Sequence, residues 1–126
     1  MITFITKHSD LIGLGHLSRC LVLCDYFLKK NHLISFILNK PIPKTLTKKR
    51  KIDVFIEENE INIINRVKNF KDISTVILDG YSFNNEFEKK LKKIIPKLVV
   101  IDDNIKQIYD CNFLIDPNLG SELIDY

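Results

Sequence analysis

The stretch LIGLGHLSRC, residues 11–20, contains the residue types whose spacing is most suited to chemistry. Gly13 and Gly15 can adopt positive φ angles, and without a Cβ they let a ligand approach the main chain. They precede an expected helix, whose free N–H groups favour negative charge. The glycines could also simply permit a tight strand-to-helix turn, because Ser18 stands where a complete G-x-G-x-x-G motif has its third glycine.

His16 stands at the N-terminus of this expected helix. The positive end of a helix dipole favours a neutral imidazole, which is the form that a general base needs at pH 7. A lone histidine is more often a packed or surface residue, so its position alone leaves both interpretations open. His8 and His32 lack such a setting, and His32 is expected to be exposed after the helix.

Other polar side chains follow the apolar segments of the chain. Asp79, Tyr81 and Asp103 come at the ends of two such segments. Acids at strand ends often cap a helix or fix a loop, and Tyr81 could be packing or could contact a sugar. Arg19, one turn beyond His16, could reach a phosphate or cover the helix surface. A metal site made of His16 and the aspartates would lack any diagnostic spacing.

Alternating strand-like and helix-like segments must position these residues. Strands are expected at 2–5, 33–38, 52–57, 75–80, 97–103 and 113–116, and helices at 15–30, 60–70 and 84–95, the last capped by Asn84 or Asn85. A loop rich in Pro and Lys is expected from Pro41 to Lys51. Continuous apolar strands between amphipathic helices indicate a parallel sheet covered on both faces. Right-handed crossovers then favour a Rossmann-like, doubly wound α/β domain.

A strand order of 3-2-1-4-5 would place a crevice between the first and fourth strands. Ligands of such sheets bind outside the carboxyl ends of the strands, where the order reverses. Asp10, Gly13 and His16 follow the first strand, and Asp79 and Tyr81 follow the fourth. The sequence therefore predicts a binding site at this edge of the sheet.

Length and composition indicate one ordinary globular domain, spanning residues 1–126. A net charge of +3 and the absence of a basic face interleaved with aromatics argue against a nucleic-acid partner. Cys20 and Cys24 are expected to pack in the core, and with Cys111 they suggest no disulfide framework, as in a reducing cytoplasm. The first apolar run is too short for a signal peptide or a membrane span.

The segment IGLGHLSRCLVLCDYF, residues 12–27, resembles the N-terminal half of a known enzyme family. This family comprises the UDP-2,4-diacetamido-2,4,6-trideoxy-β-L-altropyranose hydrolases of pseudaminic acid biosynthesis, with related spore-coat polysaccharide proteins. Its pattern IGxGHxxRC is matched by Ile12, Gly13, Gly15, His16, Arg19 and Cys20. VILDGYSF and LVVIDDN...YDCNFLIDPNLG look like two further blocks of the family, in the same order, so the resemblance covers nearly the whole chain.

This resemblance implies a two-domain glycosyltransferase-B architecture, in which the first domain holds the sugar and the second most of the UDP. His16 would be the base that activates water for attack on the anomeric carbon, with UDP leaving and the configuration inverting. Asp79 and Tyr81 would line the sugar pocket, and Asp10, Gly13, Gly15, Arg19 and Asp103 would complete the substrate-binding set. No metal or redox cofactor is implied, and the substrate is a UDP-sugar.

The chain departs from the family at several points. TKHSDL replaces an Arg-Ala-Asp-like stretch, with Lys7 and Asp10 as substitutes, Gly80 stands where the pseudaminic enzymes have His, and IDPN replaces NQN. The family continues into a second domain beyond the position of Tyr126, so the resemblance implies that activity needs a C-terminal domain or partner chain. Phe113 and Leu119 would lie near its docking surface. A glycosyltransferase, or an inactive truncated or split half, is the alternative.

Overall fold

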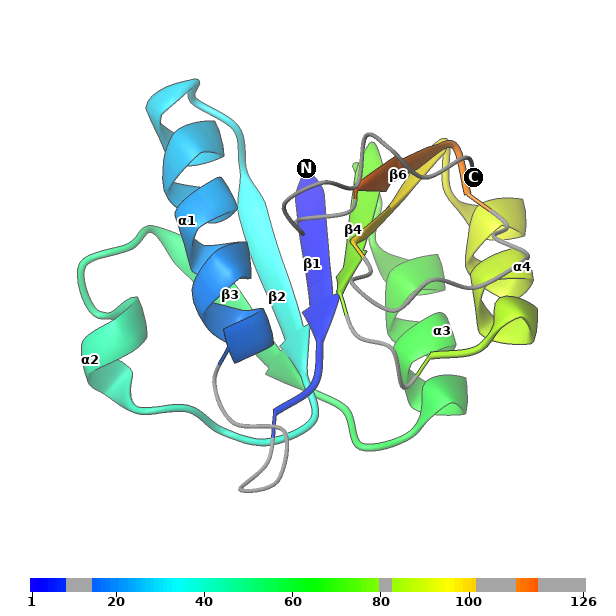
Figure 1. Cartoon of the computed structure of the whole chain (residues 1–126), viewed down its shortest axis with the longest axis horizontal. Helices are drawn as coiled ribbons and strands as arrows, with labels where there is room; N and C mark the ends of the chain where they lie inside the picture. The colour runs from blue at the N-terminus through cyan, green and yellow to red at the C-terminus, as the bar shows by residue number, and fades with distance from the viewer. Residues whose placement is uncertain (9–14, 80–82, 102–110, 116–126) are drawn as a thin grey trace, which may run out of the picture.

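An all-parallel sheet forms the centre of the protein in the computed structural model, which describes residues 1–8, 15–79, 83–101 and 111–115 (Figure 1). Within these residues the sheet has six strands in the order β3-β2-β1-β4-β5-β6. The strands are β1 Ile2–Thr6, β2 Ile34–Leu38, β3 Ile52–Ile56, β4 Thr75–Asp79, β5 Lys97–Ile101 and β6 Phe113–Ile115. The helices are α1 Gly15–Lys29, α2 Lys44–Thr47, α3 Glu60–Asn69 and α4 Asn85–Ile94.

The predicted class and strand order are confirmed. The first five strands follow the expected order 3-2-1-4-5, and β6 extends the sheet next to β5. All pairs are parallel, and the order reverses between β1 and β4, where Thr6 lies in register with Asp79. The described structure is therefore consistent with a Rossmann-like fold, with its switch point at the ends of these two strands.

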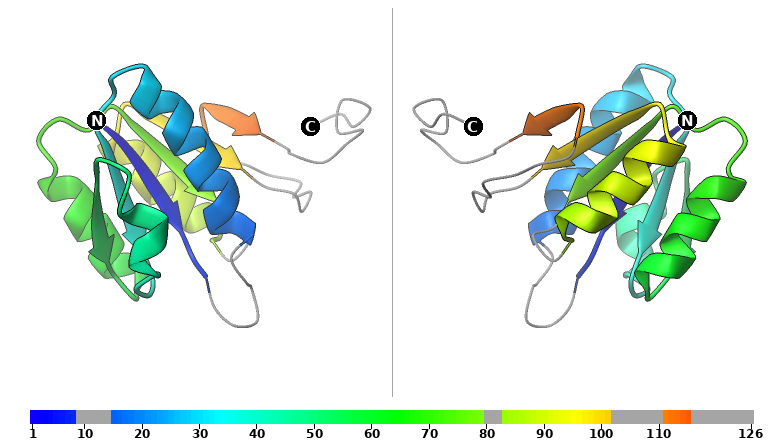
Figure 2. Two further views of the ribbon diagram at one scale, coloured as in Figure 1. Left: turned by 90° about the vertical axis from the view of Figure 1, so that its left-hand side faces the viewer. Right: turned by 90° about the vertical axis from the view of Figure 1, so that its right-hand side faces the viewer.

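Helices cover the sheet from both faces, as the two side views in Figure 2 show. The chain crosses from β1 to β2 through α1 on one face, and α3 and α4 lie on the other. The core on the α1 face is built from apolar side chains of α1 and the central strands: Ile2, Phe4, Leu17, Cys20, Leu21, Cys24, Ile34, Phe36, Leu38, Ile77 and Ile101. The opposite core contains Ile5, Ile37, Ile63, Val67, Val76, Leu78, Phe83, Phe87, Leu91, Ile95, Leu98 and Val100.

Local side-chain bonds fix the starts of α3 and α4. The Asn59 side chain accepts a hydrogen bond from the backbone N–H of Asn62, three residues on. Asn84 accepts one from the backbone N–H of Phe87 in the same way. Each bond satisfies one of the amide groups that a helix start leaves without a helical partner. Asn84, one of the two predicted candidates, is thus the cap of α4.

The predicted loop from Pro41 to Lys51 is wrong in one respect, because it contains the short helix α2. Four residues are too few to show helical periodicity, so hydrophobic patterning could not reveal it. Leu46 of this helix packs partly against the core on the α1 face. Where the predicted bounds lie within the described residues, the strand and helix bounds otherwise differ from them by at most one residue, and the predicted strand ends at 80, 103 and 116 lie outside the described residues.

Part of the α1 face is apolar and open. Phe113 is 56% exposed and Ile115 41% exposed on the edge strand β6. A groove of about 490 Å³ beside them is lined by side chains of α1, β4, β5 and β6, among them Leu23, Phe27 and Val99. Leu119, which was expected near the same surface, lies outside the described residues. In the part of the chain that the structure describes, no helix has the length and apolarity to cross a bilayer.

Candidate active site

The first turn of α1 and the end of β4 together form a compact polar cluster. His16, Arg19 and Cys20 are spaced by three and four residues, so they lie on one face of α1. Asp79 is the last residue of β4 and is completely buried. The parallel pairing of β1 with β4 places its carboxylate next to the strand from which α1 departs. Two segments distant in the sequence therefore meet at the switch point.

The Asp79 carboxylate accepts hydrogen bonds from all three α1 residues. His16 Nδ1 lies 2.8 Å from Oδ1. Arg19 binds both oxygens, with Nε 2.5 Å from Oδ2 and Nη2 2.5 Å from Oδ1. The Cys20 thiol donates to Oδ2 over 3.4 Å. The carboxylate is thus surrounded by donors, which compensates for its removal from water.

The contacts of His16 decide where its ring proton sits. Nδ1 lies 2.9 Å from Arg19 Nη2 as well as 2.8 Å from Asp79 Oδ1. A guanidinium only donates, so Nδ1 cannot accept from Arg19 while donating to Asp79. We assign the proton to Nδ1, because the other tautomer would turn its lone pair toward a carboxylate oxygen. One oxygen can accept both donors, and the imidazole lone pair is then on Nε2.

The charges in the cluster balance. Arg19 is one-quarter exposed and forms a fork on the buried carboxylate, so its positive charge offsets that of Asp79. Burial, and then the negative charge of Asp79 and the hydrogen bond to it, raise the pKa of the Cys20 thiol well above its ordinary value. The thiol therefore stays protonated and remains a donor at neutral pH.

The structure brings together four of the predicted site residues. His16, Arg19 and Asp79 are in direct contact, and Gly15 precedes His16 at the start of α1. A Cβ at Gly15 would meet nothing within 4 Å, so space is open there, and this glycine does not use the positive φ that its lack of a side chain permits. The predicted residues Asp10, Gly13, Tyr81 and Asp103 lie outside the described residues.

Several alternatives from the sequence are also resolved. Arg19 is paired with Asp79 and does not merely cover the helix surface, and its predicted contact with a phosphate stays a prediction. Asp79 does not cap α4, because Asn84 does so. His32 is exposed as predicted, whereas His8 is buried, with Nε2 bonded to the Lys40 carbonyl oxygen.

One residue of the cluster, Cys20, was not predicted to take part in it, and Thr6, which lies beside Asp79, was not predicted either. Cys20 is buried, as expected for a core residue, but its contact with Asp79 was not foreseen. Its place on the same helix face as His16 was the available signal. Thr6 lies in register with Asp79 and is 1% exposed. Among the described residues its hydroxyl has no hydrogen-bond partner.

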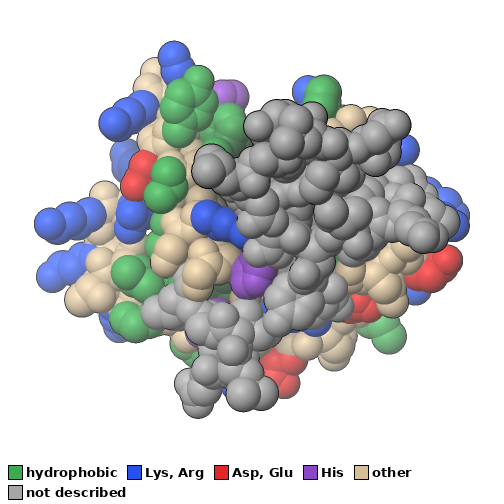
Figure 3. All heavy atoms as spheres, in the orientation of Figure 1, with side chains coloured by type: hydrophobic (Ala, Val, Ile, Leu, Met, Phe, Trp, Pro, Cys, Tyr) green, Lys and Arg blue, Asp and Glu red, His purple; other side chains and the backbone are tan. Residues whose placement is uncertain are grey.

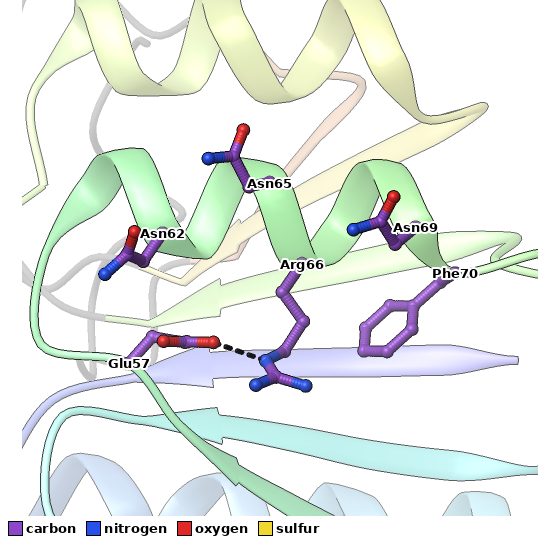
Figure 4. A pocket seen from close by; sticks show the side chains of 6 residues that line it. All are labelled: Glu57, Asn62, Asn65, Arg66, Asn69 and Phe70. Carbon is purple, nitrogen blue, oxygen red and sulfur yellow. Dashed lines mark hydrogen bonds and ion pairs between the residues drawn. The ribbon is translucent and has the colours of Figure 1, made fainter.

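Figure 3 shows one face of the molecule, on which histidine and basic side chains adjoin one another near the middle. A larger depression of about 570 Å³ lies elsewhere, along α3. Figure 4 shows that its lining side chains are Glu57, Asn62, Asn65, Arg66, Asn69 and Phe70.

The depression along α3 has a structural explanation. Arg66 donates to Glu57 over 2.5 Å, and its guanidinium lies 4.4 Å from the centre of the Phe55 ring. These contacts tie the segment after β3 to α3, and among the described residues no histidine, cysteine or hydroxyl nucleophile lines the depression. The Asp79 cluster is therefore the better candidate for chemistry. Within the described ranges, no group of three or more His, Cys, Asp or Glu side chains could hold a metal ion.

Comparison of the sequence with protein-family models gives no match, and comparison with curated proteins gives none either.

Proposed function

We propose that this chain supplies the sugar-binding, base-bearing half of a nucleotide-sugar hydrolase with glycosyltransferase-B architecture. The substrate would be a UDP-diacetamido-trideoxy sugar, used in surface polysaccharide or nonulosonic acid biosynthesis. The observation that carries this proposal is the 2.8 Å contact between His16 Nδ1 and Asp79 Oδ1. A buried carboxylate that orients an imidazole is the arrangement of a general base. The family resemblance around GLGHLSRC supplies the substrate class.

In the proposed reaction, His16 Nε2 takes a proton from water as the water oxygen attacks the anomeric carbon. The bond between that carbon and the UDP oxygen breaks, and UDP leaves with the bonding electron pair. Asp79 holds the imidazole by Nδ1 and offsets the positive charge that develops on the ring. Attack opposite the leaving group inverts the configuration, and the proton then passes from His16 to solvent. Water and UDP-sugar give free sugar and UDP.

Arg19 would reduce the net negative charge that faces His16. Its guanidinium already balances the Asp79 carboxylate, so the imidazole pairs with a carboxylate whose charge is partly neutralised.

The test combines the chain with a nucleotide-binding C-terminal domain from a hydrolase of the resembled family. The mixture is incubated with the UDP-diacetamido sugar, and free sugar and UDP are followed. We expect turnover that falls about 10²- to 10⁴-fold in His16→Ala and His16→Asn. His32→Ala is the matched control, because His32 is exposed. Unchanged turnover in a folded His16 variant contradicts the base role.

The same assay separates hydrolysis from sugar transfer. In a hydrolase, free sugar appears with no added acceptor. If product forms only when an acceptor alcohol is present, the enzyme is a glycosyltransferase, and His16 would take its proton from the acceptor hydroxyl instead of water. No turnover under either condition would count against both activities.

A further inference from the structure

Cys20 lies where it can control the geometry of the proposed base. It is fully buried, and its thiol approaches Asp79 Oδ2, the oxygen that does not face His16. Among the described residues Arg19 also donates to Oδ2, but it binds Oδ1 as well, the oxygen that faces His16. Cys20 therefore contacts the carboxylate from one side only, opposite the imidazole.

Arg19 and Cys20 differ in the conformational freedom of their side chains. Arg19 is a long side chain, one-quarter exposed, and several torsions separate its guanidinium from the backbone. The Cys20 thiol is one rotatable bond from its backbone, inside a helix and packed in the core. A short, enclosed side chain holds its partner in a narrower range of positions than a long, exposed one.

We propose that the Cys20 thiol is a positioning residue that holds the Asp79 carboxylate in the plane where Oδ1 meets His16 Nδ1. The proposal rests on the proposed function of His16 as a base. Without the thiol, Oδ2 loses its buried donor and the carboxylate can rotate toward Arg19. The bond from His16 to Oδ1 then lengthens, and the tautomer with its lone pair on Nε2 is less favoured. Burial and the Asp79 charge keep the thiol protonated, as a donor must be.

The same helix offers a matched control for packing. Cys24 lies one turn further along α1 and is also fully buried in the core on this face. Burial is also the main cause that raises the pKa of its thiol, to about 11. The contact with Asp79 distinguishes the two residues. Alanine at either position removes the same side-chain atoms, so a difference between the two variants reports that contact.

The experiment measures the His16 tautomer and the turnover in four variants: Cys20→Ala, Cys20→Ser, Cys24→Ala and Cys24→Ser. Long-range ¹H–¹⁵N spectra of the imidazole give the tautomer at pH 8 without any substrate. We expect Nδ1–H in the wild type and in Cys20→Ser, whose hydroxyl still donates to Asp79. Cys20→Ala should give a tautomer mixture. Both Cys24 variants should give the wild-type spectrum, even where their unfolding temperatures fall.

Turnover in the hydrolase assay should follow the tautomer. Loss of one hydrogen bond that orients the base predicts a fall of about three- to tenfold in kcat for Cys20→Ala, with KM changed less than about twofold. Cys20→Ser should stay within about twofold of wild type. If Cys20→Ala does not fold, Cys20→Val fills the volume without a donor and takes its place.

Two results would overturn the positioning role. One is a wild-type tautomer in Cys20→Ala, and the other is an equal loss of kcat in Cys20→Ala and Cys24→Ala. The spectra also separate this proposal from the proposed function. A tautomer change in Cys20→Ala with no turnover of any UDP-sugar would uphold the positioning of Asp79 and reject the hydrolase.

Discussion

Two arginine–aspartate forks join α1 to other parts of the molecule, and they differ mainly in their surroundings. Arg19 forms a bidentate ion pair with Asp79 of β4 inside the fold, where the carboxylate is fully buried. Arg50, after α2, grips Asp25 on the outer part of α1, with contacts of 2.7 and 3.0 Å to a carboxylate that is 46% exposed. The chemical groups are the same.

A bidentate arginine–aspartate ion pair alone therefore does not indicate a functional site. The Asp25 fork fastens α1 to the segment before β3, and water screens it. The Asp79 fork includes a histidine and a thiol in a place where charges are expensive to desolvate. Apolar side chains of similar volume would often stabilise such a position equally well or better. The buried polar cluster is therefore the better candidate for a functional site.

The largest expected difference between the two forks is the effect of removing the carboxylate charge. Asp79→Asn removes the negative charge that balances Arg19 and replaces one accepting oxygen with an NH2 donor, so it should lower the free energy of unfolding by about 3 kcal/mol. Asp25→Asn should lower it by less than about 1 kcal/mol. Urea denaturation of both variants checks this. Equal losses would mean that burial does not distinguish the forks.

A second prediction concerns two buried threonines of β1. Thr3 shares a 2.8 Å hydrogen bond with Ser35, whereas the Thr6 hydroxyl, beside Asp79, has no partner among the described residues. Thr3→Val should lower the free energy of unfolding by about 1–2 kcal/mol, because Ser35 loses its partner. Thr6→Val should leave it unchanged or raise it by up to about 1 kcal/mol. Thermal unfolding of both variants shows whether each one loses or gains stability. A loss of stability in Thr6→Val equal to that in Thr3→Val would contradict the prediction.

A third prediction uses the pH dependence of stability at the thiol next to Asp25. The pKa of Cys24 is raised to about 11 in the folded protein, chiefly by burial. Its stabilising contribution is thus complete below the ordinary pKa of 9.0 and is lost as the pH rises toward about 11. Compared with Cys24→Ala, the wild type should lose about 1 kcal/mol more between pH 8 and pH 10. Parallel stability curves for the two proteins over this interval would contradict the prediction.

The smallest expected effect is the loss, at acidic pH, of the stability contributed by the exposed ion pair between Arg50 and Asp25. The hydrogen bond from Arg50 is the main cause that lowers the pKa of Asp25 below its ordinary value of 3.8. The contribution of this pair is therefore present above that pH and lost as the pH falls through the lower, folded-state pKa. Wild type and Asp25→Asn should differ slightly at pH 6 and converge near pH 2. A difference that persists unchanged in acid would assign the effect of the substitution to packing.

Much of this architecture could be predicted because it depends on local pattern and handedness. Continuous apolar runs such as TVILD predict buried parallel strands, and right-handed crossovers then restrict the strand order. Helix α2 escaped prediction because one turn carries no periodicity. Asn84 was found because a side-chain cap is a local signal.

The site was predictable only in part, for a physical reason. His16, Asp79 and Arg19 were each suspected from position, since all lie near the ends of elements at the switch point. Their mutual contacts join residues about 60 positions apart, so they depend on tertiary packing that no local pattern encodes. The contact of Cys20 with Asp79 could not be predicted, because a buried cysteine on the apolar face of a helix is equally well explained as a core residue.

The division of the cluster between one helical turn and one distant strand has a consequence for how the cluster is lost when the protein unfolds. Three of its side chains come from a single turn of α1, and the fourth, Asp79, is in place only when β4 pairs with β1. No partly unfolded species that has separated these strands can retain the His16–Asp79 contact. The ¹⁵N signal of that imidazole therefore reports the docking of the two halves of the sheet, and it should vanish in a single step as the strands part.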